Sequence, residues 1–227
     1  MKMKSLLSWA VATIVAASTF AVEFLPLPGS QKGQIVFINR QERLAVSEIE
    51  AVCREIAKAT KCKAVLGEAA EGQVIIEIID DKDSPALAAY PEDYKATVNV
   101  GKLDKGLTGK GIEKFYVPRC RKELLRAFCF ACGAGGSQYP DNIMAIGRLA
   151  DLDLVEEFIP GDTAFTCVAR IIKIGVTPTK FVPYAKACRE GWAPAPTNDV
   201  QKAIWDKVHA MPTEPLKIKP ETKKQEK

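Results

Sequence analysis

The sequence of 227 residues predicts an α/β (α+β) fold, with helices packed on a mixed, twisted sheet of about four strands. Short runs rich in β-branched residues alternate with segments of helical periodicity. The first strand, helix and second strand follow each other in β-α-β order, which is typical of parallel pairing. Hydrophobic residues make up 47% of the chain, which is ordinary for a globular protein and sufficient for a core.

The first half of the chain supplies the predicted sheet and its first helix. Apolar runs at 34–38, 63–66 and 73–79 are expected to form buried strands, and the alternating segment 96–103 an edge strand. Between the first two runs, S-E-I-E beginning at residue 47 has the spacing of a capping box, which predicts a helix start there. Its apolar stripe predicts that this helix ends near residue 61.

Two further helices are expected in the second half. Pro118 suits the first turn of a central helix, which should run to about Cys132 before the glycine-rich segment 133–136. Thr197 or Asn198 is the expected cap of a C-terminal helix. The predicted architecture therefore has an N-terminal, a central and a C-terminal helix around one sheet.

The N-terminus has the pattern of an export signal. A short basic segment precedes a dozen apolar residues, which are too few to span a bilayer. We therefore expect residues 1–21 to be a signal peptide, with an uncleaved anchor as the alternative, and the mature chain to be periplasmic or extracellular and not membrane-embedded. We expect a leader at 22–32, one domain at 33–212 and a disordered Lys-rich tail at 213–227.

Charge and cysteine content narrow the function classes. Removal of Lys2 and Lys4 with the signal leaves 30 basic against 28 acidic residues, a balance that argues against a nucleic-acid partner. Seven cysteines in an exported chain favour disulfides, and the odd number leaves at least one unpaired within the chain. The expected pairs are Cys53 with Cys62 and Cys167 with Cys188.

The most informative motif is K-E-L-L-R-A-F-C-F-A-C at 122–132, followed by D-N-I-M-A at 141–145. It has the frame of H-E-x-x-H-x-x-G-x-x-H, in which the histidines bind zinc and the glutamate is the general base. On these residues the chain resembles the metzincin metalloproteases, with archaemetzincin-like proteins as the nearest class. The resemblance puts Glu123 in the place of the base and Met144 in the Met-turn.

The departures from the motif argue against zinc-dependent hydrolysis. Lys122 and Arg126 stand where the first two histidines would be, and both are protonated donors that cannot bind zinc. Cys132 takes the third ligand position, and His209 is the only histidine of the chain. The resemblance thus implies the fold without the metal, so we expect neither a metal nor another cofactor. Lys122 and Arg126 are expected to place positive charge where zinc would lie.

The expected function is that of an exported pseudoprotease without catalysis. It would bind a peptide, a glycoprotein or a partner protein through a cleft formed by Lys122, Glu123, Arg126, Cys132 and Met144. Two other classes stay open. The first is a secreted peptidase of aspartic type, which would use D-T-A at 162–164. That chemistry needs two such loops that share a proton. The second is a purely structural envelope protein.

Two plainer interpretations of the motif also stand. K-E-L-L-R is a common sequence for a solvated helix surface. Cys129 and Cys132 form a C-x-x-C, but at the C-terminal end of a helix, where the helix dipole raises the pKa of a thiol and disfavours redox catalysis.

Overall fold

The computed structural model describes residues 23–70, 73–88 and 93–211. The expected signal peptide at 1–21 and tail at 213–227 lie outside these residues. The chain divides into a larger unit, Pro26–Lys180, and a smaller one that joins Met1–Leu25 to Phe181–Lys227. The expected domain at 33–212 spans parts of both units. Among the described helices, none combines the length and apolar character needed to cross a membrane.

The larger unit contains the predicted four-stranded sheet, which is confirmed. Its strands are β2 (Ile35–Asn39), β3 (Ala64–Leu66), β4 (Val74–Ile79) and β5 (Lys95–Asn99), in the order β3-β2-β4-β5. All three pairings are parallel, so the sheet is more uniform than the mixed sheet that was expected. The strand predicted at an edge, β5, lies at one.

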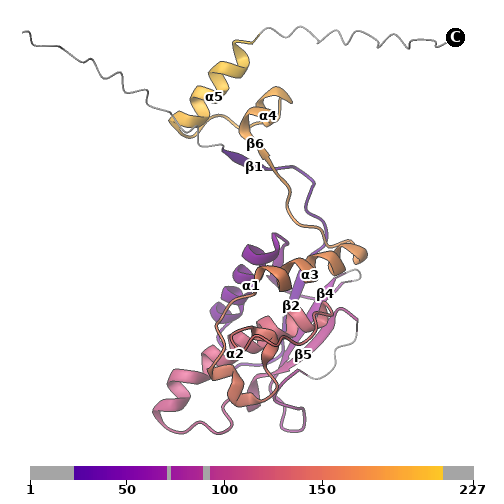
Figure 1. The fold of residues 1–227 in the computed structure, drawn as a ribbon, viewed down its shortest axis with the longest axis vertical. Coiled ribbons are helices and arrows are strands. Elements are labelled where there is room, and N and C mark those ends of the chain that lie inside the picture. The colour runs from indigo at the N-terminus through magenta and orange to yellow at the C-terminus, as the bar shows by residue number, and fades with distance from the viewer. Residues whose placement is uncertain (1–22, 71–72, 89–92, 212–227) are drawn as a thin grey trace, which may run out of the picture. The chain divides into compact units, whose positions relative to one another are not determined.

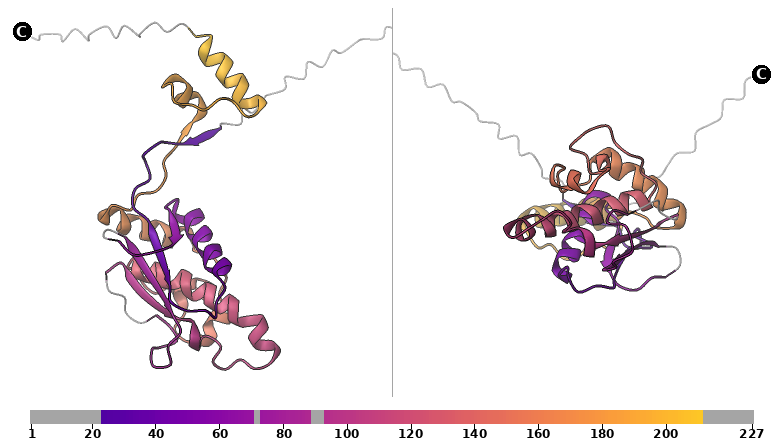
Figure 2. Two further views of the ribbon diagram at one scale, coloured as in Figure 1. Left: turned by 180° about the vertical axis from the view of Figure 1, so that it is seen from behind. Right: turned by 90° about the horizontal axis from the view of Figure 1, so that it is seen from below.

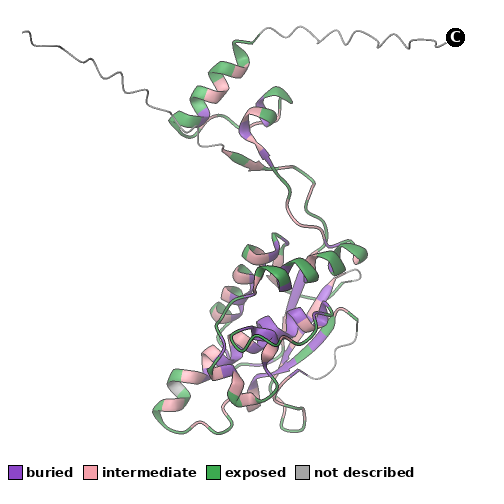
Figure 3. Ribbon diagram, in the orientation of Figure 1, coloured by how far each residue is buried: buried purple, intermediate pink, exposed green. Residues whose placement is uncertain are grey.

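The two longest helices cover one face of this sheet. Figure 1 shows α1 (Val46–Thr60) and α2 (Lys110–Ala131) on the same side of the strands, and Figure 2 shows the sheet from behind. Phe37, Ile76 and Ala96 lie in one register row and are buried, whereas Glu77 and Thr97 of the alternate row are partly or fully exposed. The colours of Figure 3 show the same contrast between covered and open parts of the sheet.

The ends of α1 were predicted with mixed success. The helix begins at Val46 after Ala45, without a side-chain cap, so Ser47 lies inside its first turn and the predicted capping box is wrong. The predicted end is confirmed, because Lys61 follows the helix in the left-handed conformation with φ 60°. The apolar stripe located the end of the helix better than the cap pattern located its start.

The start of α2 was also misplaced. The helix begins at Lys110, so Pro118 lies two turns inside it rather than in its first turn. Proline has no N–H to donate. Because the helix starts before Pro118, the backbone hydrogen bond that residue 118 would donate inside the helix is not made. The predicted end is confirmed, with Cys132 as the C-cap and Gly133 in the left-handed region at φ 72°.

Short helices complete the larger unit. The 3₁₀ turns η2 (Ile143–Ala145) and η3 (Leu149–Asp153) pack against α2, and α3 (Gly161–Ile171) packs against α1 and α2. The turns η1 (Val100–Lys102) and η4 (Ile172–Ile174) extend β5 and α3.

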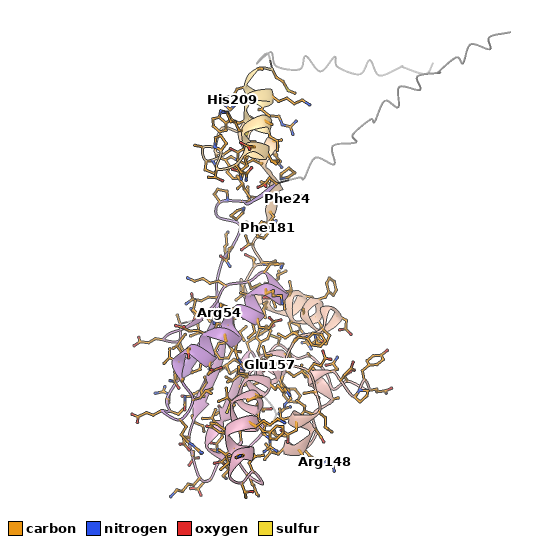
Figure 4. The ribbon with its side chains drawn as sticks, turned by 90° about the vertical axis from the view of Figure 1, so that its left-hand side faces the viewer. Phe24, Arg54, Arg148, Glu157, Phe181 and His209 are labelled. Carbon is orange, nitrogen blue, oxygen red and sulfur yellow. The ribbon has the colours of Figure 1, made fainter. Side chains whose placement is uncertain are left out.

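The smaller unit contains a strand pair and two helices. β1 (Phe24–Pro26) pairs with β6 (Phe181–Pro183), which leads into α4 (Tyr184–Arg189) and then α5 (Asp199–His209). Phe24 and Phe181, labelled in Figure 4, come from the two strands and are about half exposed. Asn198 caps α5 as predicted, since its side chain accepts a hydrogen bond from the Gln201 N–H at 2.9 Å.

Candidate functional site

The turn of α2 that carries the motif contains a buried ion pair. Glu123 is 0% exposed and Arg126 5% exposed. Arg126 donates from Nε to Glu123 Oε2 at 2.8 Å and from Nη2 to Glu123 Oε1 at 3.0 Å, a two-pronged contact. Burial raises the pKa of Glu123, and the guanidinium beside it opposes that change. The pair is one turn apart, at the i, i+3 spacing that lets helix neighbours meet.

The ion pair also holds a segment of the loop between β4 and β5. The Ala88 N–H donates to Glu123 Oε1 at 2.6 Å, and the Ala88 carbonyl accepts from Arg126 Nη2 at 3.0 Å. Both backbone groups of one buried residue are therefore satisfied by one pair of side chains. The contact fixes this loop against α2, where an unpaired buried amide would be costly.

Two other basic side chains of α2, Lys122 and Arg119, bind the η3 turn. Lys122 donates from Nζ to the Leu152 carbonyl at 2.8 Å. Arg119 binds both carboxylate oxygens of Asp153, at 2.8 and 2.6 Å. Both partners belong to η3. Lys122 and Arg126 were expected to offer positive charge to a ligand. Both side chains instead donate hydrogen bonds to groups within the larger unit.

The residues in the motif do not fit a zinc ion. Lys122 and Arg126 are donors with no free lone pair, and Glu123 is occupied by Arg126 and Ala88. His209 belongs to α5 of the smaller unit and stacks on Trp205, with ring centroids 4.2 Å apart. Within the described ranges, no three His, Cys, Asp or Glu side chains are grouped so as to hold a metal ion.

The Met-turn packs against α2 and is held by hydrogen bonds to its own backbone. Met144 is 5% exposed and lies in η2, which packs against α2. The Asn142 side chain accepts from the Met144 N–H at 2.8 Å, and the Met144 carbonyl accepts from the Ser137 N–H at 3.1 Å. These bonds hold the glycine-rich segment after α2 beside the methionine.

A pocket of about 210 Å³ opens here, which we call the Met144 pocket. One wall is the segment after α2, the second is the Met-turn, and the third is the first turn of α3. The residues that line it are Ala134, Gly135, Gly136, Ser137, Asn142, Met144, Asp162, Thr163 and Thr166.

The walls of the Met144 pocket combine polar groups with nearby aromatic residues. Asp162 and Thr166 are exposed, and the Thr166 hydroxyl donates to the Asp162 carbonyl at 3.0 Å. Tyr139, between the lining residues of the Met-turn side, is 70% exposed, and Phe165, on α3, is 76% exposed. Exposed aromatic residues around a small polar pocket are typical of surfaces that bind another molecule.

Asp162 does not have the setting of an aspartic-protease carboxylate. D-T-A at 162–164 forms the first turn of α3, and Asp162 Oδ1 accepts from the adjacent Thr163 N–H at 2.7 Å. The aspartic-type alternative therefore has no support from the local structure.

The cysteines also differ from the expectation. Cys53, Cys62, Cys167 and Cys188 are free thiols, so neither expected disulfide is formed. Cys53 lies within α1, on its buried stripe, while Cys62 follows the end of the helix and donates to the Thr60 carbonyl. Cys167 and Cys188 belong to different units. Closeness in sequence was a poor guide to pairing, because a helix points its side chains toward different neighbours.

Sequence reasoning missed two features of the site. A pairing of Glu123 with Lys122 or Arg126 was open from the sequence, but the bond of Glu123 to Ala88 joins positions 35 residues apart and was not expected. The Met144 pocket was signalled in part by the glycine-rich segment at 133–136. Its third wall, at Asp162 and Thr166, carries no local signal that connects it to α2.

Comparison with known proteins identifies the fold. No protein-family model matches the chain, and no curated protein matches it in sequence. Among solved structures, archaemetzincin from Methanopyrus kandleri superposes with a TM-score of 0.50 at 13% identity, covering 66% of this chain and 99% of that one.

Two further solved structures are similar. A zinc-dependent peptidase from Methanocorpusculum labreanum has a TM-score of 0.45 at 15% identity, and covers 60% of this chain and 100% of that one. Archaemetzincin from Archaeoglobus fulgidus has 0.42 at 12% identity, covering 59% and 99%. The likeness to the Methanopyrus kandleri structure shows that the chain has a metallopeptidase-like fold of the archaemetzincin kind.

Proposed function

We propose that this chain is an exported, non-catalytic relative of the metzincin peptidases that binds a peptide segment through the Met144 pocket. The observation that carries the proposal is the buried Glu123–Arg126 pair. It occupies the motif positions of the general base and of one zinc ligand with a contact that holds the Ala88 backbone. Three hydrogen bonds engage both oxygens of this carboxylate, which is fully buried, so it is not placed to activate water.

The Met144 pocket supports the binding part of the proposal. Its volume of about 210 Å³ is below the usual range for drug-sized ligands and suits one anchoring side chain of a peptide. Asp162 brings a carboxylate to the rim, and no lysine or arginine lines the pocket. A polar or cationic anchor fits this lining better than the peptide carboxylate that Lys122 and Arg126 suggested.

The aromatic residues beside the pocket indicate where the rest of a peptide would lie. Tyr139 lies in sequence between the lining residues Ser137 and Asn142, and Phe165 directly precedes Thr166. Aromatic side chains contribute large contact areas at low entropy cost, and they dominate many binding surfaces. A peptide bound across the pocket would thus combine one polar anchor with two apolar contacts.

The proposal is tested by panning a random peptide library on the purified chain. The enriched peptides are then measured against Thr166→Trp, which fills the pocket from an exposed wall position, and against Thr108→Trp as control. Thr108 is exposed in the loop before α2, far along the chain from the lining residues. We expect Thr166→Trp to weaken binding on the order of tenfold or more, and Thr108→Trp to leave it unchanged.

The absence of catalysis is tested separately with casein as substrate, with and without added zinc. We expect no cleavage above the buffer control. Cleavage that is lost in Glu123→Gln would contradict the pseudoprotease proposal, and equal binding by both tryptophan variants would contradict the assignment of the pocket.

A further inference from the structure

Three thiols meet where α3 packs against the end of α2. Cys129 and Cys132 come from the last turn and C-cap of α2, and Cys167 from the middle of α3. They are 0%, 1% and 0% exposed. Side-chain hydrogen bonds from Cys129 and Cys132 to Cys167 lower the pKa of the Cys167 thiol to about 5, whereas the pKa values of the other two thiols are raised.

The backbone around these thiols holds the two helices together. Tyr94 donates from its N–H to the Ala131 carbonyl at 3.1 Å, and from its hydroxyl to the Arg170 carbonyl at 3.3 Å. Arg170 donates to the Gly133 carbonyl at 3.4 Å. Tyr94 thus links the last turn of α2, which carries Cys129, to α3, which carries Cys167.

We infer that Cys167 forms a disulfide with the Cys129–Cys132 pair when the chain meets a disulfide oxidant. Neither of the disulfides expected from the sequence joined Cys167 to Cys129 or Cys132. A disulfide between two helices requires Cα atoms within about 7 Å, and α2 and α3 pack against each other.

The chemistry proceeds by thiol–disulfide exchange with a disulfide, such as oxidised glutathione. The Cys167 thiolate attacks one sulfur of the oxidant, forms a mixed disulfide and releases the first glutathione as a thiolate. Cys129 or Cys132 then loses its proton and attacks the Cys167 sulfur, which releases the second glutathione. Two protein thiols are oxidised, and one oxidant disulfide is reduced to two thiols. Because the sulfurs are buried, the exchange takes place before α3 has docked or while it is transiently undocked.

The position of this link gives it a consequence for the Met144 pocket. One wall of the pocket follows Cys132 directly, from Ala134 to Ser137, and another, from Asp162 to Thr166, directly precedes Cys167. A bond between these cysteines would tie the bases of two walls together. Oxidation would therefore preorganise the pocket for the peptide of the proposed function, on which this consequence rests.

The link is tested by peptide mapping of the whole chain. The protein is refolded with reduced and oxidised glutathione, alkylated, and digested with trypsin without reduction. Residues 127–148 contain Cys129 and Cys132, and residues 149–170 contain Cys167 alone. We expect these two peptides to be joined, to separate on reduction, and to be unlinked in Cys167→Ser. Cys53→Ser is the matched control from another part of the core and should keep the link.

Two results would overturn the inference: full alkylation of Cys167 after oxidation, or its link to a cysteine other than Cys129 and Cys132. The wild-type map is decisive even if the serine variants fail to fold. A separate arm measures an enriched peptide on reduced and oxidised protein, where we expect binding about threefold or more tighter after oxidation. An unchanged affinity would overturn the effect on the pocket only, and failure of the library to yield a peptide would bear on the proposed function and not on the link.

Discussion

The two halves of the metzincin-like motif differ in this chain: the first is buried and bonded, and the second borders a pocket. In the turn 122–126, every charged side chain is bonded to the larger unit itself, and Glu123 is fully buried. In the segment after Cys132 and in the Met-turn, backbone and side-chain bonds instead surround an open pocket. The difference teaches that the positions matching the motif's zinc ligands carry side chains that hold the larger unit together, while the neighbouring Met-turn borders a pocket.

The largest effect is expected from breaking the closed half. Arg126→Leu leaves Glu123 buried without its partner, and should lower the free energy of unfolding by about 3–5 kcal/mol. The exposed pair of Arg148 and Asp151 provides the control, since Arg148→Leu should change stability by about 0–1 kcal/mol. Urea unfolding of both variants measures the difference. Equal effects would mean that the Glu123–Arg126 pair has no special structural role.

The same variant should change the pH dependence of stability. Without Arg126, the burial of Glu123 is opposed by the Ala88 N–H only, so its folded-state pKa moves further above the unfolded value of 4.5. A raised acid pKa means that the folded state gains affinity for the proton, so the penalty is full above the folded pKa and disappears below 4.5. We therefore expect the cost of Arg126→Leu to shrink as pH falls toward this value, measured by unfolding at several pH values. A cost independent of pH would show that Glu123 is not the destabilising group.

A smaller effect is expected at the joint between the two halves. Gly133 has a φ of 72°, and a Cβ added there would lie 2.9 Å from Arg170 Nη2. Gly133→Ala should cost about 1–2 kcal/mol through backbone strain alone. Gly135 needs no left-handed conformation and has no atom within 4 Å of an added Cβ, so Gly135→Ala is the matched control and should be nearly neutral. Thermal unfolding of both variants decides whether the end of α2 is held as described.

The sequence predicted the sheet well, because its strands are continuous apolar runs whose burial is a local property. The ends of α1 and α2 were predicted where a left-handed residue or glycine stops the helix, at Lys61 and Gly133. Their starts were not. Ser47 and Pro118 have side chains that suit a first turn, but the surrounding contacts extend both helices beyond them.

The site was predicted less completely than the fold. The motif predicted the helix that forms α2, because its spacing is set by helix geometry. What Arg126 would do depends on Ala88, and what borders Met144 depends on Asp162. Both are contacts between distant segments, and no periodicity or cap pattern records them. The burial of charge at Glu123 is therefore a tertiary property that the motif could not reveal.

The bond between Arg126 and Ala88 has a consequence for any attempt to build a zinc site at the motif. Replacing Lys122 and Arg126 by histidine would restore two ligands on paper, but it would also remove the donor for the Ala88 carbonyl and the partner of Glu123. The segment at Ala88 would lose one of the contacts that hold it against α2. We therefore expect a zinc site at these positions to require changes in the loop between β4 and β5 as well, because the contacts around the motif, and not two residues alone, oppose a metal there.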